Sequence, residues 1–167
     1  GINLEGFLLL KDKVLTFYTT NNENFQFFKL KVLDNKLTIP NETILLDSLP
    51  LVNVGNSKAF YVKASPDKSK ILLFNIVKTK SSFFVRFTVM DDSLRILKRN
   101  IFTLTDVSNV SLKSIKVSNQ GSVVAAIGHE GGYDNQDYNF DKYTIFAYNP
   151  STNTISEQML MSQDAIL

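Results

Sequence analysis

The sequence predicts an all-β protein made of three antiparallel units with four strands each. Three observations carry this prediction. Runs such as "FFKLKVL" (27–33) alternate apolar and polar side chains, which is the pattern of a strand with one buried face. Turn-forming pairs such as Pro66-Asp67 and Asp91-Asp92 separate these runs. Finally, similar segments recur along the chain at offsets of 53 to 58 residues.

The third and fourth strands of each unit follow from one of these repeats. The segment "FFKLKVLDNKL" (27–37) matches "FVRFTVMDDSL" (84–94) without a gap, at an offset of 57 residues. A third copy, "TIFAYNPSTNTI" (144–155), places Asn149 at the position of Asp91 and has a longer turn. Each copy therefore contains a strand, a polar turn and a returning strand. We expect the returning strands at 36–46, 93–104 and 154–160.

The first and second strands follow from the other repeat. The stretch "ASPDKSKILLF" (64–74) has the same layout as "VSNQGSVVAAI" (117–127), with a polar turn between two apolar runs. The alignment pairs Ser65 with Ser118, Ile71 with Val124 and Phe74 with Ile127. The first unit has a matching pair of strands at 6–19, joined by a tight turn at Lys11-Asp12. The three units then cover about 5–46, 58–105 and 111–160 of a single all-β domain, 1–167.

The "SPD" turn before "KILLF" (70–74) resembles the turn that joins the inner strands of TolB-type and WD-repeat blades in β-propeller proteins. The chain departs from that pattern at Lys68, where the family usually has glycine, and at Asn119-Gln120-Gly121, which keeps the glycine but lacks Pro-Asp. The resemblance implies that each unit is one propeller blade.

Three blades would leave the ends of the array open, because propellers usually close with about four to eight blades. The chain is therefore expected to be a fragment of a longer propeller, or to complete a ring with a second copy. Open sheet edges also favour self-association. The alternative fold is a β-sandwich of about ten to twelve strands.

Composition excludes several classes of protein. The 44% of hydrophobic residues in 167 is typical of a folded domain, and the net charge of +2 does not favour nucleic acid as a partner. The absence of cysteine excludes disulfides, cysteine-ligated metals and thiol nucleophiles. No apolar run approaches the ~20 residues of a membrane helix, so no membrane insertion is expected. The localisation stays open, although the resemblance slightly favours a periplasmic or secreted setting.

The most unusual segment is "GHEGGYDNQDYNFD" (128–141), which interrupts the third unit between its second and third strands. It is rich in glycine, aromatic and acidic residues, and it is longer than an ordinary hairpin loop. We expect a ligand-binding loop that contacts a protein, peptide or glycan through Glu130, Tyr133, Asp134 and Tyr138. The alternative is a solvated insertion without a ligand.

The same segment contains a weak metal pattern. Asp137, Asn139 and Asp141 alternate with other residues, and oxygen ligands at that spacing can wrap Ca²⁺. However, Lys142 stands where an EF-hand-like loop needs glycine, and no bidentate glutamate follows. Apart from this Ca²⁺ site, no cofactor is predicted. His129 is the sole histidine, and we expect it to be an ordinary polar residue.

No catalytic constellation emerges from these residues. The predicted function is therefore a non-catalytic binding or scaffold module of the β-propeller type, and an enzyme is the less favoured possibility. The alternative is the propeller part of a larger glycosidase, lyase or peptidase. In that case Glu130, Asp134 and Asp137 are the first carboxylates to test.

Overall fold

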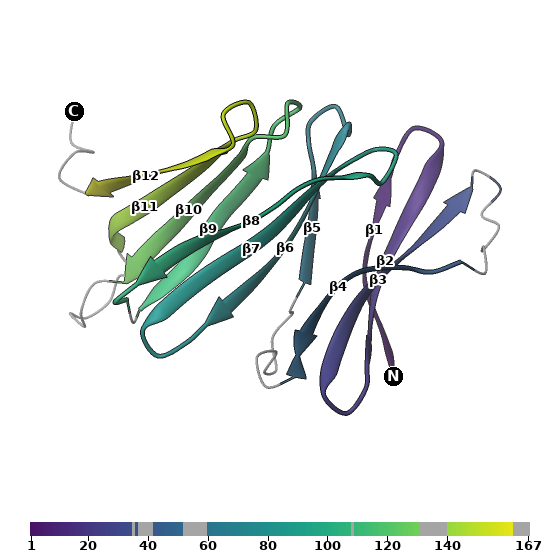
Figure 1. Ribbon diagram of the computed structural model, residues 1–167, viewed down its shortest axis with the longest axis horizontal. Coiled ribbons are helices and arrows are strands. Elements are labelled where there is room, and N and C mark those ends of the chain that lie inside the picture. The colour runs from purple at the N-terminus through teal and green to yellow at the C-terminus, as the bar shows by residue number, and fades with distance from the viewer. Residues whose placement is uncertain (35, 37–41, 52–59, 108, 131–139, 162–167) are drawn as a thin grey trace.

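The computed structural model describes residues 1–34, 36, 42–51, 60–107, 109–130 and 140–161, with the backbone alone at 130, 140 and 141. In these residues, twelve strands form three separate four-stranded sheets, and every pairing is antiparallel. Within each sheet the strands lie in chain order (Figure 1). The predicted fold class is therefore confirmed: an all-β chain of three four-stranded antiparallel units that resemble propeller blades.

Each sheet comes from one stretch of the chain. The first contains β1 (Ile2–Leu9), β2 (Lys13–Asn21), β3 (Phe25–Asp34) and β4 (Ile44–Pro50). The second contains β5 (Phe60–Ala64), β6 (Lys70–Lys78), β7 (Ser82–Asp91) and β8 (Ile96–Thr105). The third contains β9 (Val110–Val117), β10 (Val123–Glu130), β11 (Phe140–Asn149) and β12 (Thr154–Met161). The two-sheet β-sandwich considered as an alternative does not fit this topology.

The sheets stack face to face around two apolar cores. One core joins the first and second sheets and includes Phe28 and Phe60, whose rings stack with centroids 4.6 Å apart. The other joins the second and third sheets and includes Phe102 and Phe146, with ring centroids 5.1 Å apart. Burying each such side chain stabilises the fold by about 1.5–3 kcal/mol. These two cores hold the three sheets as one stack.

The alternating pattern of the sequence explains why both faces of the second sheet are covered. On β7, Val85, Phe87 and Val89 are buried in the core shared with the third sheet. Arg86 and Thr88 alternate with them, and alternate residues of a strand point to opposite faces. These two residues therefore face the first sheet, where the polar pocket described below is found.

The first strands of the sheets converge. The strand β5 contacts both β1 and β9, while β4, β8 and β12 are the opposite edge strands of their sheets. The sheets consequently splay apart from a common inner side, as propeller blades do around their axis (Figure 1).

The strand boundaries reproduce one predicted repeat. The strand Phe25–Asp34 recurs as Ser82–Asp91, displaced by 57 residues at both ends, and again as Phe140–Asn149. Their equivalence allows residues on different sheets to be compared position by position.

The other alignment is wrong by one residue after its turn. Ile71 pairs with Met90 and is fully buried, and in the third sheet the matching pair is Val123 with Tyr148. Val124, the residue that the ungapped alignment matched to Ile71, is 46% exposed. Ile71 is therefore equivalent to Val123, because the turn in the third unit is one residue shorter than the turn in the second.

The turns themselves are equivalent up to that deletion. The hydroxyl of Ser65 accepts a hydrogen bond from the N–H of Lys70 at 2.9 Å, and the hydroxyl of Ser118 accepts one from the N–H of Ser122 at 3.0 Å. Lys68 has a φ of 61° in the second unit, where the third unit has Gly121 with a φ of 89°. The missing glycine noted in the sequence thus leaves a lysine in the left-handed region.

One returning strand also differs from its prediction at 36–46. Its described strand is β4, which runs from Ile44 to Pro50 and pairs with Phe25 to Leu30. Residues 37–41 of the predicted strand lie outside the described part of the chain. The strand therefore ends four residues later than the apolar pattern indicated, because Leu49 still packs in the core after the polar pair Asp47-Ser48.

Candidate functional site

The predicted ligand-binding loop is largely outside the described residues. The structure does not describe five of its predicted site residues: Tyr133, Asp134, Asp137, Tyr138 and Asn139. The backbone of Glu130 ends β10 and pairs with Phe140, and Asp141 lies in β11, but their side chains are not described. The ligand and Ca²⁺ sites assigned to this loop therefore remain predictions. Among the residues that the structure does describe, no three His, Asp or Glu side chains form a group that could hold a metal.

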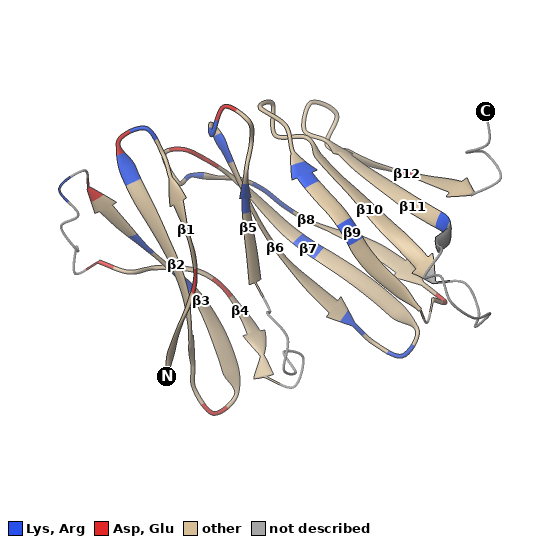
Figure 2. Cartoon of the chain, turned by 180° about the vertical axis from the view of Figure 1, so that it is seen from behind, with Lys and Arg blue, Asp and Glu red and all other residues tan. Residues whose placement is uncertain are grey.

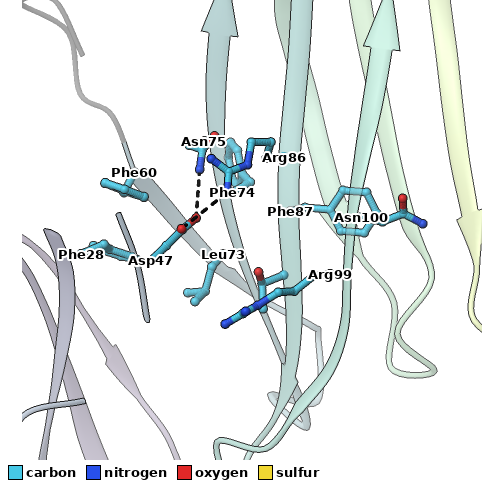
Figure 3. Close-up of a pocket in the computed structure, with 11 residues that line it drawn as sticks. Phe28, Asp47, Phe60, Leu73, Phe74, Asn75, Arg86, Phe87, Arg99 and Asn100 are labelled. Carbon is cyan, nitrogen blue, oxygen red and sulfur yellow. Dashed lines mark hydrogen bonds and ion pairs between the residues drawn. The ribbon is translucent and has the colours of Figure 1, made fainter. Parts of the chain in front are cut away.

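The described part of the chain contains a polar pocket between the first and second sheets (Figure 3). We call it the inter-sheet pocket. It has a volume of about 80 Å³ and combines apolar walls with charged and amide side chains. Its polar residues come from four strands: Asp47 on β4, Asn75 on β6, Arg86 and Thr88 on β7, and Arg99 and Asn100 on β8.

A β-bulge places Asp47 in this pocket. Phe28 pairs with Asp47 and Lys29 pairs with Leu45, so Leu46 is the extra residue on β4. The bulge turns Leu46 and Asp47 to the same face, because an extra residue disrupts the alternation of a strand. Leu46 is buried in the core beneath, and Asp47 reaches the second sheet.

The carboxylate of Asp47 accepts two hydrogen bonds and forms one ion pair. Its Oδ1 accepts from the N–H of Ser48 at 2.8 Å and lies 3.5 Å from Nη2 of Arg86. Its Oδ2 accepts from Nδ2 of Asn75 at 3.3 Å. The Asp47 and Arg86 side chains are 31% and 43% exposed, and such partly exposed ion pairs contribute about 0–1 kcal/mol. The pair thus orients groups in the pocket more than it stabilises the fold.

Two groups in the pocket have unused hydrogen-bonding capacity. Asn75 is 2% exposed, and its Oδ1 has no hydrogen-bond partner. Its amide orientation is fixed, because Nδ2 has to face the carboxylate of Asp47. Arg99 also forms no ion pair or hydrogen bond with a described residue, and its side chain extends from β8 toward the first sheet (Figure 3). The pocket therefore has two cations, one anion and a buried acceptor without a donor.

Sequence reasoning missed this pocket because its residues looked like ordinary strand positions. Arg86 fits the exposed phase of its strand, and nothing in the sequence indicates the bulge at Leu46. One signal was present: Asn75 interrupts the apolar run "KILLFNIV" (70–77), and its equivalent in the third sheet is the buried Ile127. A polar residue at a core position is a departure that can mark a site.

His129 has a local role within the third sheet. Its Nε2 lies 2.8 Å from the hydroxyl of Thr144, which is fully buried on the neighbouring strand. Burial and, secondarily, the positive charge of Lys142 lower the pKa of His129 below its ordinary value of 6.5. The neutral ring is therefore favoured at neutral pH, where it joins β10 to β11.

The two ends of the stack carry exposed apolar side chains. Each sheet has a front face, on the side that the second sheet turns toward the first, and a back face, on the side that the second sheet turns toward the third. The front face of the first sheet exposes four large side chains of β1, which are 59–75% exposed: Ile2, Leu4, Phe7 and Leu9. The back face of the third sheet exposes Val124 at 46% and Leu160 at 41%.

Charged residues are spread over the described fold (Figure 2). Lys and Arg occur in all three sheets, and several Asp and Glu lie in the connecting turns (Figure 2). In the described ranges, no helix has the length and apolar character needed to span a membrane. The expected lack of a nucleic-acid partner stays a prediction.

Comparisons with known proteins give distant likenesses. No family model matches the sequence, and no curated protein is similar to it. Among solved structures, the chain has a distant likeness to the cobalt-substituted apocarotenoid oxygenase of Synechocystis, at 12% identity and a TM-score of 0.43. Two mutants of that oxygenase match at 10% identity, with TM-scores of 0.43 and 0.40. Each match covers 88% of this chain and 35% of the other, so the chain spans about a third of those structures. At these values nothing about activity is carried over.

Proposed function

We propose that this chain is a non-catalytic binding and scaffold module whose partner is another β-sheet protein of the same kind, in the simplest case a second copy. The observation that carries the proposal is the repeated contact inside the stack. The back face of the first sheet packs on the front face of the second, and the back face of the second packs on the front face of the third.

Equivalent residues make these two contacts alike. Ile71 on the front face of the second sheet and Val123 on the front face of the third are both fully buried. Val85 lies on the back face of the second sheet, and its equivalent on the third is Tyr143. Within the described residues, no further sheet covers the front face of the first sheet or the back face of the third, and we call these the two unused faces.

An unused back face fits an unused front face, because that contact already occurs twice within the chain. Contacts of this head-to-tail kind generate a closed ring or an open filament, according to the rotation between copies. The apolar side chains of β1 would be covered by the third sheet of a neighbouring copy. The predicted loop 128–141 remains a second surface through which a protein, peptide or glycan could be engaged.

Sedimentation velocity on the full chain tests the proposal. The chain is expected to form assemblies whose mass rises with concentration in the micromolar range. Phe7→Lys should block the front face, and Val124→Lys should block the back face, since a charge in an apolar contact is costly. Lys80→Ala, at an exposed position in the turn between β6 and β7 of the middle sheet, is the control and should assemble normally.

Mixing the two blocked variants tests the head-to-tail geometry. Each variant keeps one intact face, so each alone should be monomeric and an equimolar mixture should form a dimer. A front-to-front contact would instead leave Val124→Lys able to dimerise. A wild-type chain that stays monomeric up to about 100 μM, well above the Kd of ordinary specific contacts, would overturn the proposal.

A further inference from the structure

The inter-sheet pocket offers a positive charge that no described residue balances. Among the described residues Arg86 pairs with Asp47 at 3.5 Å, and Arg99 on the adjacent strand has no partner. A guanidinium group has five N–H donors, of which the pair with Asp47 uses few. One added carboxylate would bring the charge of these groups to zero and would accept several of these donors.

Asn75, a residue that lines the pocket, also has one atom without a hydrogen-bond donor. Oδ1 of Asn75 is buried and unpartnered, and a buried polar atom without a partner costs about 1–3 kcal/mol. Asn75 stands on the strand next to Arg86, with which it pairs in register. A ligand that both balances the arginine charge and donates a hydrogen bond to Asn75 would carry a donor close to its carboxylate.

The shape of the pocket limits the size of that ligand. Its volume of about 80 Å³ is walled by Phe28, Phe60 and Leu73, and it has room for a group of a few heavy atoms. The partial exposure of Asp47 and Arg86 leaves the pocket accessible from solvent. A small acid could enter whole, and a larger acid could insert its acidic end.

We infer that the inter-sheet pocket binds a hydroxycarboxylate, either as a free small acid or as the acidic end of a sugar acid. The carboxylate accepts hydrogen bonds from Arg99 and from the free N–H groups of Arg86, and the hydroxyl on the adjacent carbon donates to Oδ1 of Asn75. Asp47 holds Arg86 in position. This inference depends on the pocket alone and is independent of the assembly proposed above.

Isothermal titration of the full chain with matched acids tests the inference. Lactate and propanoate carry the same carboxylate and differ by the hydroxyl, so lactate should bind about threefold to tenfold more tightly, the worth of one hydrogen bond. A separate titration with glucuronate tests binding of a sugar acid. Binding of glucuronate without lactate would indicate the larger source, and binding of lactate without glucuronate the smaller one.

Three variants assign the contacts. Arg99→Ala should weaken both lactate and propanoate by about tenfold or more, because hydrogen bonds to charged groups are the stronger ones. Asn75→Leu should remove the preference for lactate while propanoate still binds. Arg95→Ala is the control, since Arg95 pairs with Asp91 in a turn away from the pocket, and it should bind like the parent chain.

Three results would overturn the inference. The first is no heat of binding for lactate or glucuronate at millimolar concentrations. The second is a preference for lactate that survives in Asn75→Leu. The third is displacement of lactate by chloride at equal concentration, which would show a general anion effect. None of these results bears on assembly, which is measured separately by sedimentation.

Discussion

Replacing Asn75 by leucine should make the protein more stable. The two side chains have nearly the same shape, so the change mainly removes polarity at a site that is 2% exposed. It eliminates the penalty of the unpartnered Oδ1, about 1–3 kcal/mol, and it sacrifices the 3.3 Å hydrogen bond to Asp47, worth about 0.5–1.5 kcal/mol. Asp47 is partly exposed and can be solvated instead. The net expectation is a gain of ~1 kcal/mol.

Urea denaturation at pH 7, followed by circular dichroism, measures this gain. The midpoint should rise with an unchanged m-value, and the melting temperature should increase by about 2–4 °C for a chain of this size. Asn3→Leu is the control, because Asn3 is exposed on β1 and outside the pocket, so the same substitution there removes no buried unpartnered atom. A loss of stability in Asn75→Leu would refute the reasoning, since it would mean that Oδ1 already has a donor in the folded protein.

Three further predictions concern the turns and the third sheet. Lys68→Gly should raise the free energy of unfolding by about 1 kcal/mol in chemical denaturation, and Gly121→Ala should lower it by a similar amount, because both positions have positive φ. A destabilised Lys68→Gly or a stabilised Gly121→Ala would contradict the equivalence of the two turns. Ser65→Ala should cost about 0.5–1.5 kcal/mol in the same assay, because it removes the hydrogen bond that the Ser65 hydroxyl accepts from the N–H of Lys70, and a neutral result would contradict it. Because the folded-state pKa of His129 is lowered, its contribution to stability should be complete above pH 6.5 and decline as the pH falls below it. Thermal melts across pH 5–8 should show this decline, and His129→Gln should remove it.

The fold could be predicted from the sequence because its signals are local and repeated. The alternation on 27–33 and 84–90 marks half-buried strands, and the same pattern recurs in each unit. The turn at Ser65 and its counterpart at Ser118 were matched correctly, since both hydroxyls accept the same hydrogen bond. The register after the turn was misplaced, because a deletion of one residue in a turn changes no apolar pattern that an ungapped alignment would detect.

The candidate site could not be predicted, because it depends on contacts between strands far apart in the chain. Asp47 and Asn75 are 28 residues apart and meet only when the first two sheets stack. The bulge at Leu46 that turns Asp47 inward has no distinctive sequence signal. The sequence pointed instead to the loop 128–141, because an unusual composition is a local property that is visible without the fold.

The assignment of this chain to TolB-type or WD-repeat propellers stays a prediction. The architecture of stacked four-stranded sheets does not depend on that resemblance. It follows from the two apolar cores and from the convergence of β1, β5 and β9.

The most direct test of the stacked architecture is a nuclear Overhauser spectrum of the chain with phenylalanine rings labelled. The rings of Phe28 and Phe60, and those of Phe102 and Phe146, belong to different sheets and have centroids 4.6 and 5.1 Å apart. Strong cross-peaks are expected within both pairs, together with backbone contacts between strands confined to each set of four. Backbone contacts that join strands of different sets into one continuous sheet would contradict the account.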